Sequence, residues 1–144
     1  LIFIVTSIIF FSLPNLALFK SNNLEDNSEW LDLTKINLKE LIRQNDIVFV
    51  DITADWCATC QFNKINVLQK KSIQDLFSNN NVVKVRGDWT KPNSAIESFL
   101  QQYQRFGIPF NILYSKNNPQ EIILSELLSE KKILKAFNTL LLNE

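Results

Sequence analysis

The chain has 144 residues, of which 46% are hydrophobic and 21% charged, so it is long enough for one well-packed domain with a short additional segment. Its 15 basic and 15 acidic residues cancel, and no basic run exceeds two residues. This charge pattern argues against a nucleic-acid partner, which requires a basic surface.

Residues 1–19 carry no charge and are mostly apolar. As a helix they span about 28 Å, close to the roughly 30 Å hydrocarbon core of a bilayer. We interpret them as an N-terminal hydrophobic helix that spans the membrane. Pro14 and Asn15 interrupt the run, so a signal segment with Ala17 at its cleavage site is an alternative, and a buried core helix is another. Either of the first two places the following domain outside the cytoplasm.

The first residue is Leu1 and the chain lacks methionine, so we expect a fragment or a processed product. Residues 20–29 are polar and predict a linker. The folded domain is predicted over residues 30–144. It opens with a strand at 30–33 and a helix through residue 44 that is capped by Thr34.

The middle of the domain follows an alternating strand and helix pattern. Residues 47–53 begin with an uninterrupted apolar run. Such a run predicts a strand that is covered on both faces. After the cysteines in sequence, apolar residues recur at helical spacing and are expected in the core, namely Phe62, Ile65 and Leu68. A second helical turn is predicted near residues 73–77.

The second half continues the pattern with strands and helices in alternation. The apolar spacing predicts a strand at 82–88 and a helix over 93–106. The apolar stripe of this helix ends at Phe106, and Gly107 is predicted to stop the helix. Strands at 110–114 and 122–124 are joined by a turn at 115–119, and Ile133, Leu134, Phe137, Leu140 and Leu141 give a last amphipathic helix.

Cys57 and Cys60 form a Cys-x-x-Cys pair where a strand gives way to a helix, six residues after the acid Asp51. A thiolate in the first turn of a helix lies against unpaired backbone N–H groups, so its pKa falls. A fall from roughly 8.5 to about 7 makes about half of the thiol ionised at neutral pH. The sequence predicts Cys57 as an exposed nucleophile and Cys60 as a buried resolving thiol.

Other uses of a Cys-x-x-Cys pair have to be weighed. Zinc takes four ligands as a rule, and this chain has two cysteines and no histidine, which nearly excludes a closed zinc site. An inert disulfide, or a soft-metal site made across two chains, are the remaining alternatives to redox exchange.

Three segments carry a resemblance to a known family. The sequences VFVDITADWCATC (48–60), GDWT (87–90) and FGIPFNILY (106–114) resemble the C-terminal periplasmic domain of DsbD-type thiol:disulfide interchange proteins, within the thioredoxin superfamily. The resemblance covers residues 30–142. It implies an α/β, thioredoxin-like fold with a central mixed sheet and helices on both faces.

The resemblance also implies roles for single residues. Cys57 matches the attacking nucleophile and Cys60 the resolving thiol. Pro109 matches a cis-proline that faces the pair, with the backbone of Ile108 pairing with a substrate strand. Asp51 matches a buried acid whose pKa is raised by desolvation and which exchanges a proton with Cys60. The alternatives are a structural acid at Asp51 and an ordinary trans-proline at Pro109.

Three further residues have weaker assignments. Trp56 is expected to shield one side of the thiols and to contribute to substrate binding. Asp55 either tunes their charge or is merely solvated. Lys64 stands where these domains often carry an acid, which favours the thiolate and leaves Asp51 as the only nearby proton relay.

For function, the resemblance implies a protein-disulfide reductase on the periplasmic side of the bacterial inner membrane, anchored or secreted. It receives electrons from a membrane-embedded dithiol and passes them to oxidised periplasmic proteins, including those of cytochrome c biogenesis. No bound cofactor or metal is expected besides the redox-active cysteine pair. A thioredoxin-fold binding module with a purely structural disulfide, and a soft-metal handling protein, are the alternatives.

Overall fold

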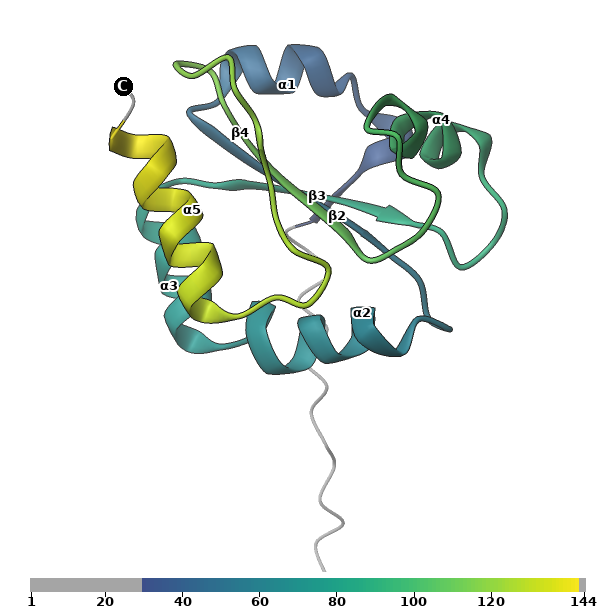
Figure 1. Ribbon diagram of the computed structural model, residues 1–144. Helices are drawn as coiled ribbons and strands as arrows, with labels where there is room; N and C mark the ends of the chain where they lie inside the picture. Colours follow the sequence, from purple (N-terminus) through teal and green to yellow (C-terminus); the bar gives the residue numbers. More distant parts are fainter. Residues whose placement is uncertain (1–29, 143–144) are drawn as a thin grey trace, which may run out of the picture.

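The computed structural model describes residues 30–142 (Figure 1). The predicted hydrophobic segment 1–19 and the whole of the predicted linker 20–29 lie outside these residues. In chain order the elements are β1 (Trp30–Asp32), the 3₁₀ turn η2 (Leu33–Lys35), α1 (Leu38–Gln44), β2 (Ile47–Thr53), α2 (Ala58–Asn63), the π-helical turn η3 (Lys64–Leu68), α3 (Lys71–Asn79), β3 (Val83–Asp88), α4 (Ser94–Gln102), β4 (Phe110–Ser115), β5 (Ile122–Ile123) and α5 (Glu130–Leu142).

The five strands form one mixed sheet in the order β1-β3-β2-β4-β5. β3 runs parallel to both β1 and β2, whereas β4 is antiparallel to β2 and to β5. This confirms the predicted central mixed sheet. Among the described residues no helix is both long and apolar enough to cross a bilayer.

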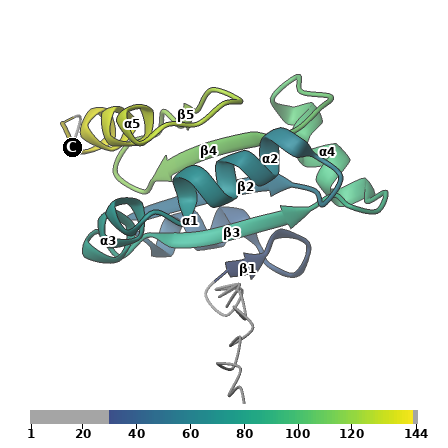
Figure 2. The ribbon, with the colours of Figure 1, turned by 90° about the horizontal axis from the view of Figure 1, so that it is seen from below.

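Helices cover both faces of the sheet, as predicted: α1 and α4 lie on one side, and α2, α3 and α5 on the other (Figures 1 and 2). β2 is buried along six consecutive residues because both of its faces are covered. Its side chains alternate between two cores. Phe49 packs with Phe77 and Phe137, while Val50 packs with Ile96 on the opposite face.

The register of the strands brings three loops to one edge of the sheet. Thr53, at the end of β2, pairs with Asp88 at the end of β3, and Ile52 pairs with Phe110 at the start of β4. Because β2 and β3 are parallel and β4 is antiparallel, the segments that follow β2 and β3 and the one that precedes β4 meet at this edge.

The first helix begins later than the sequence predicts. Thr34 lies in η2, where Asp32 caps its backbone N–H, and Ile36 is extended. α1 starts at Leu38 because the side chain of Asn37 accepts a hydrogen bond from the backbone N–H of Glu40 at 3.2 Å. The prediction that Thr34 caps this helix is therefore wrong.

The helix predicted over 93–106 ends at residue 102, five residues before Gly107. Gln104 takes the left-handed conformation with a φ of 55°, and the backbone N–H groups of Arg105 and Gln104 donate to the carbonyls of Leu100 and Gln101. This is a Schellman motif that uses glutamine instead of glycine. Phe106 consequently lies outside the helix and is 81% exposed, contrary to the predicted stripe.

Several apolar residues predicted for the core are exposed. Between Cys60 and Val67 the inward position is taken by the polar Asn63, so Phe62 and Ile65 point outward and are 47% and 60% exposed. In α5 the buried side chains include Ile133, Phe137 and Leu140, whereas the exposed ones include Leu134 and Leu141.

Candidate functional site

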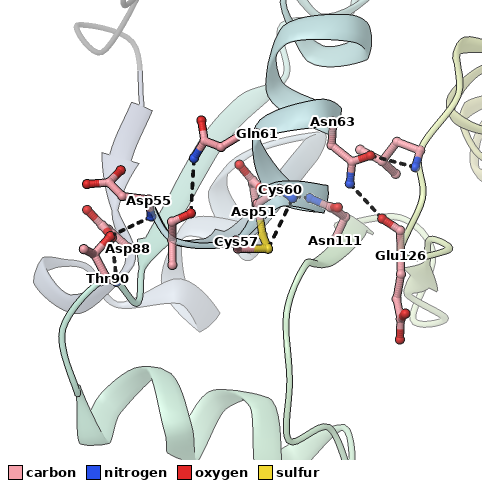
Figure 3. The surroundings of a disulfide bond; sticks show 12 residues. Asp51, Asp55, Cys57, Cys60, Gln61, Asn63, Asp88, Thr90, Asn111 and Glu126 are labelled. Atoms are coloured by element: carbon pink, nitrogen blue, oxygen red, sulfur yellow. Dashed lines mark hydrogen bonds between the residues drawn. A yellow bond between two sulfur atoms is a disulfide. The ribbon is translucent and has the colours of Figure 1, made fainter.

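Cys57 and Cys60 are joined by a disulfide at the start of α2 (Figure 3). Cys57 is the N-cap of the helix, and its Sγ accepts a hydrogen bond from the backbone N–H of Cys60 at 3.2 Å. A thiolate at this atom would accept the same bond more strongly, because hydrogen bonds to charged acceptors are the stronger ones. The position predicted for the pair, at a helix N-terminus, is confirmed.

Both cysteines are largely covered in this disulfide form. Cys57 is 7% exposed and Cys60 3%, and they form a small buried cluster with Ala54 against which Ile108 packs. As predicted, Cys57 is more exposed than Cys60. The prediction that Cys57 is exposed is nevertheless wrong for this form, because Ile108 and the loop before the helix lie against the cysteine pair.

The Ile108–Pro109 peptide is cis, as the resemblance implied. Pro109 is buried and Ile108 half-buried, and Ile108 brings this segment against the cysteines from the loop that precedes β4. The structure thus places together the cysteine pair and the peptide predicted to bind substrate. The pairing of the Ile108 backbone with a substrate strand stays a prediction.

Asp51 lies in β2 on the face that α2 covers, and it is 5% exposed (Figure 3). Asn111, directly opposite in β4, donates from Nδ2 to Asp51 Oδ1 at 2.8 Å. Arg86, directly opposite in β3, approaches Asp51 Oδ2 with Nε at 3.4 Å. The carboxyl group is therefore held between the two neighbouring strands, directly behind the cysteine-bearing helix.

Desolvation by burial raises the pKa of Asp51, and this outweighs the opposing effects of Arg86, Asn111 and Lys64. The predicted direction of the change and its cause agree with the structure. Lys64 is half-buried at the start of η3, and its positive charge acts on the Asp51 carboxyl from the helical layer. A raised pKa makes the Asp51 carboxylate a better proton acceptor than an exposed carboxylate.

The segment between β2 and Cys57 is held by Thr90, which follows β3. Thr90 Oγ1 accepts a hydrogen bond from the backbone N–H of Asp55 at 2.9 Å, and the Thr90 carbonyl accepts one from the Trp56 indole at 3.3 Å. Asp88 in turn accepts from the backbone N–H and the hydroxyl of Thr90. These bonds tie the GDWT segment to the residues that lead into the cysteine motif.

Trp56 and Asp55 are both exposed. Trp56 is 63% exposed, and the centroid of its ring lies 6.5 Å from that of Trp89. The exposure of the Asp55 side chain favours the solvated alternative for this residue. Any role of either residue in tuning the thiols or binding substrate stays a prediction.

Asn63 fastens the cysteine-bearing helix to the loop before α5 (Figure 3). Its Nδ2 donates to the Glu126 carbonyl at 2.7 Å, and its Oδ1 accepts from the backbone N–H of Leu128 at 3.0 Å. On the other side of the same helix, Gln61 Nε2 donates to the Ala54 carbonyl at 3.1 Å. These three bonds fix the helix that carries the cysteines.

Sequence reasoning missed these supporting residues. Asn111 gave a signal, since it is a polar residue within the apolar strand FNILY, and Asn63 gave one at a helical spacing of three from Cys60. The Asp88-x-Thr90 pattern is typical of a turn closed by the Asp side chain. Arg86 gave no comparable signal, because charged and apolar residues alternate along its strand VKVRGD.

Comparison with known proteins agrees with this architecture. The C-terminal domain of DsbD from Neisseria meningitidis in its oxidised form superposes with a TM-score of 0.60 at 17% identity, covering 76% of this chain and 97% of that domain. Its reduced form gives 0.56 at 19% identity, covering 71% and 85%. A thioredoxin from Thermus thermophilus gives 0.58 at 16% identity, covering 78% and 86%. No curated protein sequence matches the chain.

These structural similarities occur at low sequence identity, so they show a shared fold alone. The fold and the Cys57–Cys60 pair together support thiol:disulfide oxidoreductase as the class of activity. The family model described as "Thioredoxin-like" matches residues 29–116, which is more than half of the sequence. The chain therefore belongs to the thioredoxin-like family.

Proposed function

We propose that this chain is a protein-disulfide reductase, which cycles Cys57 and Cys60 between the dithiol and the disulfide. The observation that carries the proposal is the placement of the pair. Cys57 Sγ is the capping acceptor of α2, and Ile108, from the loop before β4, packs against the cysteine cluster. A structural disulfide needs neither a sulfur that caps a helix nor a neighbouring loop packed against it.

The reaction begins at Cys57. Its thiolate attacks one sulfur of the partner's disulfide, so a Cys57–partner bond forms and the other partner sulfur leaves as a thiolate. Cys60 then gives its proton to Asp51 and attacks Cys57 Sγ. The Cys57–Cys60 bond forms, and the second partner sulfur leaves as a thiolate. Two electrons have passed to the partner, and Asp51 holds the proton until the pair is reduced again.

Asp51 is placed for this exchange because it lies behind α2 and is excluded from water. Since burial raises the pKa of Asp51, its carboxylate is a stronger base than an exposed one and accepts a thiol proton more readily. The chemistry of the dithiol itself requires no bound cofactor.

We further propose that the reduced form is regenerated by a membrane-embedded dithiol and that the partners are oxidised proteins of the periplasm, including those of cytochrome c biogenesis. The support is the sequence resemblance, the shared fold with a DsbD C-terminal domain, and the uncharged apolar segment 1–19. Fusion of the whole chain to a reporter enzyme that is active only after export tests the location. Reporter activity is expected, and its absence in an expressed fusion contradicts the location.

The reductase activity is tested with insulin as a model protein disulfide. The wild-type chain, Cys57→Ser and Cys60→Ser are reduced and mixed with it. Wild type is expected to cleave the insulin disulfides, and Cys57→Ser is expected to be inactive. Cys60→Ser should accumulate a mixed disulfide through Cys57, because it cannot resolve the bond. Full activity of Cys57→Ser, or no mixed disulfide with Cys60→Ser, contradicts the proposal.

A further inference from the structure

The side-chain amide of Asn111 is buried, and its nitrogen and its oxygen differ in their hydrogen bonding. The residue is 1% exposed, and its Nδ2 donates to Asp51 Oδ1 at 2.8 Å. Its own Oδ1 is buried and has no hydrogen-bond partner among the described residues. Buried acceptors are normally paired. An unpaired amide oxygen next to a proton-accepting carboxyl group therefore needs an explanation.

The groups that face the Asp51 carboxyl determine which hydrogen bonds it can make when it is protonated. Arg86 approaches from β3, Lys64 acts from η3, and the Cys57–Cys60 pair lies on α2. Arginine and lysine side chains can only donate hydrogen bonds, and thiols are weak acceptors. A protonated Asp51 has an O–H donor, and the strong acceptor that directly faces it is the Asn111 amide, once its oxygen replaces its nitrogen.

Rotation of the amide by half a turn makes this replacement without moving the backbone, because the oxygen and the nitrogen exchange places. In the present orientation the oxygen points to a position that offers it no donor, so the rotation breaks no hydrogen bond there. The bond to Asp51 is kept, with its direction reversed.

We propose that Asn111 is a positioning residue for proton transfer by Asp51, donating to the carboxylate from Nδ2 and, after its amide turns, accepting from the protonated acid at Oδ1. This inference rests on the proposed function, in which Asp51 takes the proton of Cys60. Asn111 then keeps the carboxyl group in one place through both of its protonation states.

The test uses Asn111→Leu, which keeps the shape of the side chain but neither donates nor accepts. The reduced protein is oxidised by oxidised glutathione in a single turnover, followed by tryptophan fluorescence from pH 5 to pH 9. At pH 7 the resolution step is expected to slow by at least about fivefold, because the carboxyl group is no longer held in one position for proton transfer. The pH midpoint should rise, since the carboxylate loses a donor that lowers the pKa of Asp51.

Two comparisons separate this role from a merely structural one. In an Asp51→Asn background, Asn111→Leu should cause no further loss of rate, because a residue that acts through Asp51 has nothing left to position. Asn111→Thr, whose hydroxyl both donates and accepts, should be faster than the isosteric Asn111→Val. The Thr and Val pair also serves if Asn111→Leu fails to fold, which thermal unfolding of the oxidised forms will show.

The outcomes are distinguishable. A wild type that does not react with disulfides overturns the proposed function and this inference with it. A reactive wild type overturns this inference alone if Asn111→Leu leaves the pH profile unmoved. The same holds if Asn111→Leu slows the step equally with and without Asp51, or if the Thr and Val variants react at the same rate.

Discussion

Replacing Asn63 with alanine tests whether the cysteine-bearing helix is fastened to the loop before α5. The substitution removes a donor from the Glu126 carbonyl and an acceptor from the buried backbone N–H of Leu128. A buried polar group without a partner costs about 1–3 kcal/mol, and the Glu126 carbonyl, which lies nearer the surface, costs less. We expect a loss of about 2–4 kcal/mol in the free energy of unfolding, a large share of a typical 5–15 kcal/mol.

The assay is urea unfolding of the oxidised protein, with Asn66→Ala as the matched control. Asn66 is the same residue type in the continuation of the same helix, but it is exposed, and its side chain donates to the Phe62 carbonyl at 3.2 Å. Its removal should change the free energy of unfolding by no more than about 0.5 kcal/mol. Equal effects of the two substitutions, or a loss below about 1 kcal/mol for Asn63→Ala, would refute the reasoning.

Further predictions concern Asp51 and two phenylalanines. Burial raises the pKa of Asp51 above 3.8, so the ionised carboxylate destabilises the folded state at pH values above the raised pKa. Asp51→Asn removes this charge and should stabilise the oxidised fold in that pH range. The gain in the free energy of unfolding should be about 1.4 kcal/mol for every tenfold change in the acid dissociation constant. That gain should vanish below pH 3.8, where both states are protonated; urea unfolding across pH checks this, and a constant gain contradicts it. Phe77→Ala should cost about 3–5 kcal/mol, because Phe77 is 2% exposed, whereas Phe106→Ala at 81% exposure should change stability little; equal melting temperatures would contradict the assigned burial.

The features that local patterns determine could be predicted from the sequence. The apolar run of β2 specifies a strand covered on both faces, and the residue types around Cys57 place it at a helix start. The chain order of strands and helices then limits the architecture to a mixed sheet between two helical layers. The burial of Asp51 followed from its place within the central strand.

The contacts that support the site could not be predicted, because their partners are far apart in sequence. Asn63 and Leu128 are 65 residues apart, and Asn111 and Asp51 are 60 apart. The exposure of Phe106 depends on Gln104, which takes a left-handed conformation that a glycine would normally be expected to fill. Local propensity does not show which of two residues ends a helix.

The reduction potential of the Cys57–Cys60 pair tests the central claim most directly. It is measured by equilibrating the whole chain with dithiol and disulfide mixtures of known potential and counting free thiols. A pair that exchanges electrons with partner proteins is predicted to have a potential above about −300 mV and to titrate reversibly. A potential below that value would identify a structural disulfide and contradict the reductase account.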